Sequence, residues 1–206
     1  MNKIFIESGR TNTNESQFIR TILNKFFNKS CSIDYELINT GGFYNLAAVK
    51  QKFEDSESDD DKNIVIFDAD FKLSGGGFYN RKRFLLEEAQ RLHVNFELFL
   101  FPNNAEDGMF ESLLQKIVNP KYSKLLDFFS EYESKIMEFN TQLKEDVFET
   151  PDEKAKIYSY ISAFKRSNRE KESFKNKGDW DFANEKYWNL ESSELNPLKD
   201  FWAKFF

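Results

Sequence analysis

The chain has 206 residues, of which 40% are hydrophobic and 31% charged, a composition that fits one globular domain with an extension and excludes a disordered protein. No apolar stretch approaches the roughly 20 residues of a membrane-spanning helix, and the first ten residues lack the apolar run of a signal peptide, so we expect a cytoplasmic protein with no membrane partner. The net charge of −6 excludes attraction of nucleic acid by the surface as a whole, and a single cysteine and a single histidine exclude a disulfide framework and a histidine-based zinc site.

The first part of the chain predicts strands that alternate with helices. In chain order these are strand 3–7, helix 15–29, strand 33–39, helix 44–53, strand 63–67, helix 80–92, strand 95–101 and helix 106–118. Residues 64–67 of the strand at 63–67 are all apolar, as in strands buried on both faces. Because helices separate the strands, right-handed crossovers and a parallel sheet are expected. The fold class of residues 1–120 is therefore α/β, with a Rossmann-like parallel sheet of about four strands flanked by helices.

Beyond Pro120 the sequence predicts helices and no convincing strand. Their ranges are 121–143, 152–164 and 196–206, each with apolar residues at helical spacing. We interpret residues 121–206 as a C-terminal helical extension packed on the domain of residues 1–120. The acidic run at 54–62 is interpreted as a solvated loop before the next strand.

Two aspartates, Asp68 and Asp70, follow the buried strand at 63–67. If that strand continued, both carboxylates would point to the same side, where they repel each other unless a cation lies between them. Glu7 ends the first strand, and the carboxyl ends of parallel strands line the ligand crevice of such sheets. If the two strands are neighbours, the three carboxylates converge. Oxygen ligands without histidine or cysteine suit Mg²⁺ or Mn²⁺.

Two further acidic residues, Asp107 and Glu111, lie four apart near the start of the helix at 106–118 and would add to this metal site. Each of these two residues also has an alternative interpretation, in which its role is structural. Acidic residues in a first helical turn often cap the helix or stabilise its dipole, which fits Asp107. Glu111 fits equally well as an exposed helix residue.

A first candidate surface for phosphates lies on the helix at 80–92, where Arg81 and Arg83 follow three glycines at 75–77. The glycines would let backbone amides approach a phosphate, although glycines also simply form loops. We slightly favour the loop.

A second candidate surface is the basic segment 165–177, which includes Lys165, Arg166 and Arg169. Nearby aromatic residues would stack a base beside the bound backbone; they are Phe174, Trp180 and Trp188. The alternative is a solvated loop with both tryptophans in the core.

Four segments, taken in order, resemble the TOPRIM domain of topoisomerases, DnaG-type primases and OLD-family nucleases. They read "IFIES", "NTGGF", "VIFDADFKLSGGGF" and "LFPNNAEDGMFESLL", and they are similar to small stand-alone bacterial proteins related to the OLD-type TOPRIM domain. The resemblance covers residues 3–118 and, more loosely, the helical tail with its closing "NPLKDFWAKFF". One departure is that Ser8 stands where the family has glycine after its glutamate, and a longer polar turn leads to Glu15.

The resemblance implies a TOPRIM-like sheet and Mg²⁺-dependent, nuclease-like chemistry on phosphodiester bonds. Glu7 would be the catalytic acid/base or a metal ligand, and Asp68 and Asp70 would hold the ion. The alternative is a non-catalytic TOPRIM-like module that binds nucleic acid or protein, for example in phage defence with an ATPase partner. The intact carboxylates favour the enzyme, whereas the altered turn after Glu7 and the acidic net charge favour the module.

Overall fold

The computed structural model describes residues 1–10, 12–55, 61–144, 147–177 and 180–206. The chain divides into two compact units. The first unit consists of Met1–Leu113 and Leu190–Phe206, and the second of Leu114–Asn189. Within the described residues, none of the helices combines the length and the apolar character needed to cross a membrane.

A four-stranded, all-parallel sheet forms the centre of the first unit, with the strand order β2-β1-β3-β4. Its strands are β1 (Asn2–Ile6), β2 (Tyr35–Asn39), β3 (Asn63–Asp68) and β4 (Glu97–Phe101). The chain passes from β1 outward to β2 and then returns to β3 on the other side of β1. The carboxyl ends of β1 and β3 therefore flank the switch point at which such sheets bind ligands.

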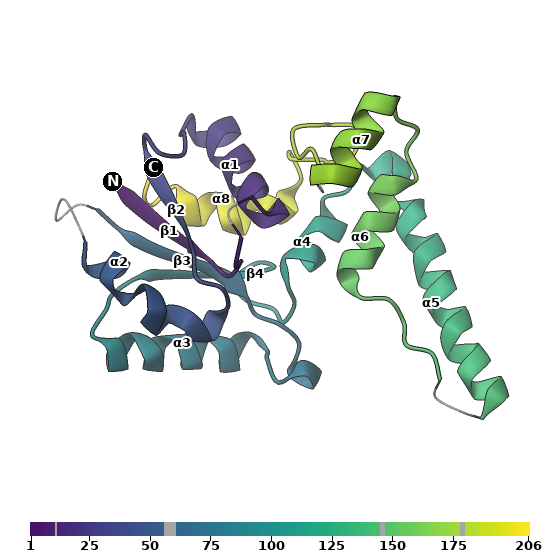
Figure 1. Cartoon of the computed structure of the whole chain (residues 1–206), viewed down its shortest axis with the longest axis horizontal. Helices are drawn as coiled ribbons and strands as arrows, with labels where there is room; N and C mark the ends of the chain where they lie inside the picture. The colour runs from purple at the N-terminus through teal and green to yellow at the C-terminus, as the bar shows by residue number, and fades with distance from the viewer. Residues whose placement is uncertain (11, 56–60, 145–146, 178–179) are drawn as a thin grey trace. The chain divides into compact units, whose positions relative to one another are not determined.

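Helices cover both faces of this sheet (Figure 1). On one face lie α1 (Asn14–Phe27) and α8 (Asn196–Trp202); on the other lie η1 (Phe43–Val49), α2 (Lys50–Glu54) and α3 (Phe78–Leu92). The ring centroids of Phe99 and Phe201 are 5.3 Å apart on the first face, and those of Phe5 and Phe53 are 3.8 Å apart on the second. Burial on both faces explains why residues 64–67 of β3 are all apolar, and the layered arrangement confirms the predicted α/β fold class.

The second unit is helical. It contains η3 (Pro120–Tyr122), α5 (Lys124–Leu143), α6 (Glu153–Ser162) and α7 (Asn168–Lys177). Its core includes Tyr160, Trp180 and Trp188, which are all buried. The indole Nε1 of Trp188 donates to the backbone oxygen of Trp180 at 3.0 Å, so the polar atom of this buried ring is satisfied.

The structure differs from the sequence-based expectations at several places. Most of the basic segment 165–177 forms the helix α7 and not the solvated loop that was one of its interpretations. Residues 43–49 form a 3₁₀ helix before α2 instead of one continuous helix. The helix predicted at 106–118 is α4 (Phe110–Lys116), because the Asn103 side chain accepts the amides of Ala105 and Glu106 in a preceding turn. The closing segment 190–206, with η4 (Ser193–Leu195) and α8, belongs to the first unit and not to the helical extension.

Candidate functional site

Glu7 and Asp68 meet at the carboxyl ends of β1 and β3. Glu7 directly follows β1, and Asp68 is the last residue of β3. The Asp68 amide donates to Oε2 of Glu7 at 3.3 Å. In turn, Oδ1 of Asp68 accepts the amide of Phe110, the first residue of α4, at 2.7 Å. The predicted convergence of Glu7 and Asp68 is therefore present.

Two more glutamates act electrostatically on this pair. Burial raises the pKa of Asp68 well above its usual range, and the negative charges of Glu7 and Glu111 raise this pKa further. Burial likewise raises the pKa of Glu15, with additional contributions from Asp68, Glu7 and Glu111. The pKa of Glu7 is also raised by burial, although the Asp68 amide opposes the shift. We call Glu7, Glu15, Asp68 and Glu111 the acidic cluster.

Glu15 is the member of the acidic cluster that the sequence analysis did not assign to the site. It lies in the first turn of α1, whose N-cap Thr13 accepts the amide of Ser16 at 3.3 Å through its hydroxyl. A helix that follows a strand of a parallel sheet begins at the carboxyl edge of that sheet. The position of an acidic residue in the first helical turn after β1 could therefore have predicted that Glu15 lies at the site.

Replacing Glu15 by glutamine should stabilise the fold at neutral pH, because burial and the neighbouring negative charges disfavour the charged form of this carboxyl. A carboxyl whose pKa is raised on folding binds more protons in the folded state, so the free energy of unfolding falls as pH rises from the unfolded to the folded pKa. As pH rises above the ordinary pKa of a glutamate, in chelator, the variant should therefore lose less stability than the wild type in urea denaturation.

The matched control for this prediction is Glu87→Gln, which removes the same charge from an exposed position on α3. It should keep the pH dependence of the wild type. Equal pH dependence in Glu15→Gln and the wild type would contradict the electrostatic coupling of Glu15 to the rest of the acidic cluster.

Asp70 differs from the acidic cluster in its backbone and in having an ion pair, although its negative charge also raises the pKa of Glu7 and of Asp68. The strand does not continue beyond Asp68, and Asp70 adopts a left-handed conformation with φ of 58°. Its Oδ2 accepts a hydrogen bond from the buried guanidinium of Arg81 on α3. The guanidinium also stacks 3.2 Å from the ring centroid of Phe43. The expectation that a continuing strand would point Asp68 and Asp70 to one side is thus corrected.

The three glycines after this turn form a loop with internal hydrogen bonds. The amides of Gly75, Gly76 and Gly77 donate to backbone oxygens of the same segment at 3.0, 3.0 and 2.9 Å. These donors are therefore engaged within the protein, which agrees with the loop interpretation and not with a phosphate cradle. A Cβ on Gly76 would lie 2.4 Å from Cβ of Asp70 and 2.9 Å from the oxygen of Ala69.

Because two backbone segments approach so closely, Gly76→Ala should destabilise the fold by about 2 to 3 kcal/mol in urea denaturation. Gly9→Ala is the matched control, since its added Cβ would meet only the Cα of Gly41, at an ordinary 3.7 Å. That variant should change the free energy of unfolding by less than about 0.5 kcal/mol. If the two substitutions changed the free energy of unfolding equally, the close contact at Gly76 would not be a determinant of stability.

Asp107 and Glu111 have separate roles. Asp107 precedes α4, so the two do not share one face of that helix. Oδ1 of Asp107 accepts the amide of Phe78, the first residue of α3, at 2.8 Å, and Oδ2 lies 3.7 Å from Nζ of Lys72. Asp107 thus caps a helix, as one interpretation expected, but the capped helix is α3 and not α4. Glu111, in the first turn of α4, belongs to the acidic cluster.

The residues predicted to bind nucleic acid differ in how far their side chains are exposed to solvent. Arg83 and Lys165 are exposed. Arg81 is buried against Asp70, and Arg166 donates to the backbone oxygen of Ile161 with its guanidinium 4.3 Å from the ring centroid of Phe174. The side chain of Arg169 lies outside the described residues.

The aromatic rings near the basic segment, Phe174 among them, are buried in the second unit. Trp180 and Trp188 lie in its core, as one of the two interpretations had it, so neither is exposed to stack a base.

The donor chemistry of the acidic cluster fits a hard divalent cation. It consists of carboxylates alone, which Mg²⁺ and Mn²⁺ prefer and structural zinc sites rarely use. The cluster is nevertheless not arranged as a finished coordination shell. Within the described ranges, no three side chains of Asp, Glu, His or Cys group closely enough to hold one ion.

These features define an α/β protein with a parallel sheet and an acidic cluster at its switch point. The chain matches the family model described as "Protein of unknown function (DUF3226)" over residues 15–206, and it belongs to that family. The matched range includes Glu15, Asp68 and Glu111 and begins after Glu7. Neither a curated protein nor a solved structure matches the chain.

Proposed function

We propose that this protein is a TOPRIM-like enzyme that uses Mg²⁺ or Mn²⁺ for chemistry on the phosphodiester bonds of nucleic acid. The observation that carries the proposal is the acidic cluster at the switch point between β1 and β3. Partly buried carboxylates that raise one another's pKa repel each other, and a divalent cation would relieve that repulsion. The order of the motifs along the chain, from "IFIES" to "FDAD", supports the TOPRIM assignment.

The roles of the residues follow from their contacts. Asp68 and Glu7 would hold the ion, and Glu111 and Glu15 would add negative charge beside it. The ion, when bound, stabilises negative charge that develops on phosphate oxygens. Burial raises the pKa of Glu7 above its usual range, which is the direction that suits a carboxyl that gives and takes a proton. The amide of Phe110 orients Asp68.

The ion pair between Asp70 and Arg81 supports a second candidate function, a TOPRIM-like module that binds nucleic acid or protein without cutting it. In this candidate an internal cation engages the second aspartate of "FDAD", so the motif would lack one of its metal ligands. A cytoplasmic location stays a prediction from the sequence composition, and an ATPase partner and a role in phage defence stay predictions of the resemblance.

Cleavage of end-labelled oligonucleotides distinguishes the two candidates. We expect the full chain to cut DNA or RNA in Mg²⁺ or Mn²⁺ and to stop when the metal is chelated. Single-stranded and duplex forms of both nucleic acids would be compared. Binding without any metal-dependent cleavage would contradict the enzyme and favour the module.

A further inference from the structure

The first unit exposes three aromatic side chains, and all of them lie in segments that surround the carboxyl edge of its sheet. Tyr44, Phe71 and Tyr79 have exposed fractions of 64%, 38% and 76%. Among the described residues of this unit, every other aromatic side chain is buried or half-buried. Leu73, in the same loop as Phe71, is fully exposed. We call Tyr44, Phe71, Leu73 and Tyr79 the aromatic rim.

A chain of contacts connects two members of the rim to the "FDAD" turn. Tyr44 follows Phe43, whose ring lies over the guanidinium of Arg81. That guanidinium holds Asp70, and Phe71 is the next residue along the chain. Tyr44 and Phe71 therefore come from different loops that meet at one ion pair.

Tyr79 is connected to the same turn through a different set of hydrogen bonds. It follows Phe78, whose amide donates to Asp107 at 2.8 Å. The loop of Asp107 is tied to the turn by the Gly108 amide, which donates to the backbone oxygen of Asp70 at 2.9 Å. Because these neighbouring segments are fixed by hydrogen bonds and burial, the exposed rings stand on ordered backbone.

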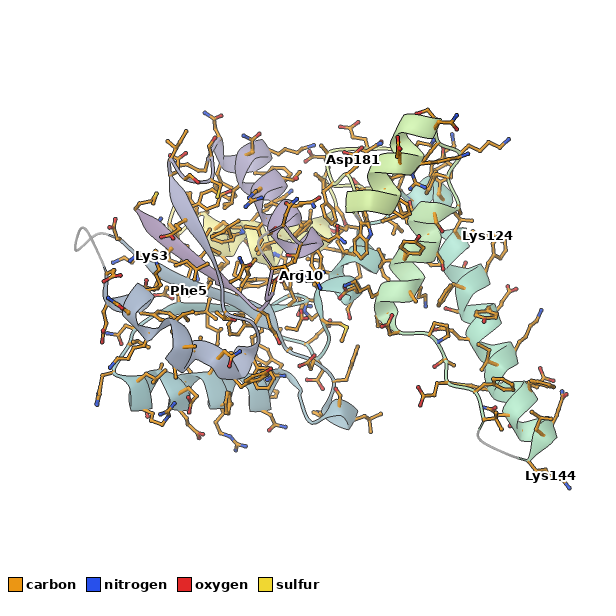
Figure 2. The ribbon with its side chains drawn as sticks, viewed as in Figure 1. Lys3, Phe5, Arg10, Lys124, Lys144 and Asp181 are labelled. Carbon is orange, nitrogen blue, oxygen red and sulfur yellow. The ribbon has the colours of Figure 1, made fainter. Side chains whose placement is uncertain are left out.

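Cationic side chains accompany the rings. Lys72 lies between Phe71 and Leu73, and its side chain is 71% exposed. Lys82 and Arg83 are exposed on α3, a few residues after Tyr79. Arg10 is exposed in the segment after β1, and Figure 2 shows it near the end of the sheet at which that strand finishes. Aromatic rings interleaved with cations are suited to bind a nucleic-acid strand, because the rings stack on its bases and the cations attract its negatively charged phosphates.

We propose that the aromatic rim stacks unpaired bases, so that the nucleic acid this site takes is single-stranded. The inference rests on the function proposed for the acidic cluster and names the class of its substrate. A duplex keeps its bases stacked on one another inside the helix, and its outer surface offers charged backbone to an aromatic ring. A single strand presents base faces that exposed tyrosine and phenylalanine bind without sequence preference.

Fluorescence anisotropy tests the proposal with the full chain and a labelled oligothymidylate, in chelator so that nothing is cut. The wild type should bind this single strand at least about tenfold more tightly than a hairpin duplex. The variant Tyr44→Ala/Phe71→Ala/Tyr79→Ala should lose about 100-fold in affinity for the single strand while its duplex binding stays nearly unchanged. Removing exposed rings should leave the thermal unfolding midpoint unaltered.

The control is Ile33→Ala/Leu86→Ala, which truncates two exposed apolar side chains of the same unit outside the rim and should bind as the wild type does. Three results would overturn the proposal: equal affinity for the single strand and the hairpin duplex, no binding of the single strand, or unchanged single-strand binding by the triple variant. Metal-dependent cleavage restricted to duplexes would overturn it and leave the proposed chemistry standing. Rim-dependent binding without metal-dependent cleavage would support the rim and refute the chemistry.

Discussion

Replacing Asp68 by asparagine should lower the rate of metal-dependent cleavage by about a thousandfold or more. Asp68 is the member of the acidic cluster that touches both β1 and α4, through Glu7 and Phe110. Asparagine can still accept the Phe110 amide through its carbonyl oxygen, so the fold should persist. What the substitution removes is the negative charge that would hold the cation. Single-turnover cleavage of a labelled oligonucleotide in saturating Mg²⁺ measures the effect.

The matched control is Asp107→Asn, which makes the same chemical change at the same edge of the sheet. Its amide oxygen can still accept the Phe78 amide, and the residue is outside the acidic cluster. We therefore expect the control to cut within about tenfold of the wild type. Equal losses in the two variants would mean that general negative charge, and not the Asp68 carboxylate, determines the rate.

Replacing Arg81 by methionine should lower the free energy of unfolding by about 2 to 4 kcal/mol. Arg81 has an exposed fraction of 6%, pairs with Asp70 and stacks on Phe43. Loss of a buried partner usually costs about 3 to 5 kcal/mol, but the Asp70 side chain is 26% exposed, and water therefore moderates the penalty. Urea denaturation followed by circular dichroism gives the value.

A double-mutant cycle with Asp70→Asn separates the ion pair from the packing of the Arg81 side chain. Once Asp70 carries no charge, the further loss from Arg81→Met should be smaller than in the wild-type background. The coupling should be about 1 kcal/mol or more, because the two groups form a charge-assisted hydrogen bond. Additive effects of the two substitutions would contradict the ion pair as a stabilising contact.

The fold was predictable because each of its signals is local. The unbroken apolar run at 64–67 indicated a strand buried on both faces, and in the structure α1 and α8 cover one face and α2 and α3 the other. The convergence of Glu7 and Asp68 followed from the strand order once β1 and β3 were assumed to be neighbours. Periodicity could not reveal that α8 returns to the first unit, since it shows that a helix has an apolar face but not what covers it.

The details of the site were less predictable because they depend on contacts between loops. The left-handed backbone of Asp70 arises where its segment packs against Gly76, and the partner of its carboxylate comes from α3. Similarly, Asp107 caps a helix about 30 residues earlier in the chain. Burial raises the pKa of Glu15 on α1, and the charge of Asp68 on β3 adds to that shift. Sequence spacing describes which residues share one element, and these contacts join different elements.

Isothermal titration of Mg²⁺ into the wild type and into Asp68→Asn tests the central claim most directly, because it needs neither substrate nor turnover. The account predicts that the wild type binds the ion, that bound Mg²⁺ raises its thermal unfolding midpoint, and that the variant loses both effects while remaining folded. The same binding heat in both proteins, or no binding by the folded wild type, would contradict the claim that the carboxylates at the switch point form a divalent-cation site.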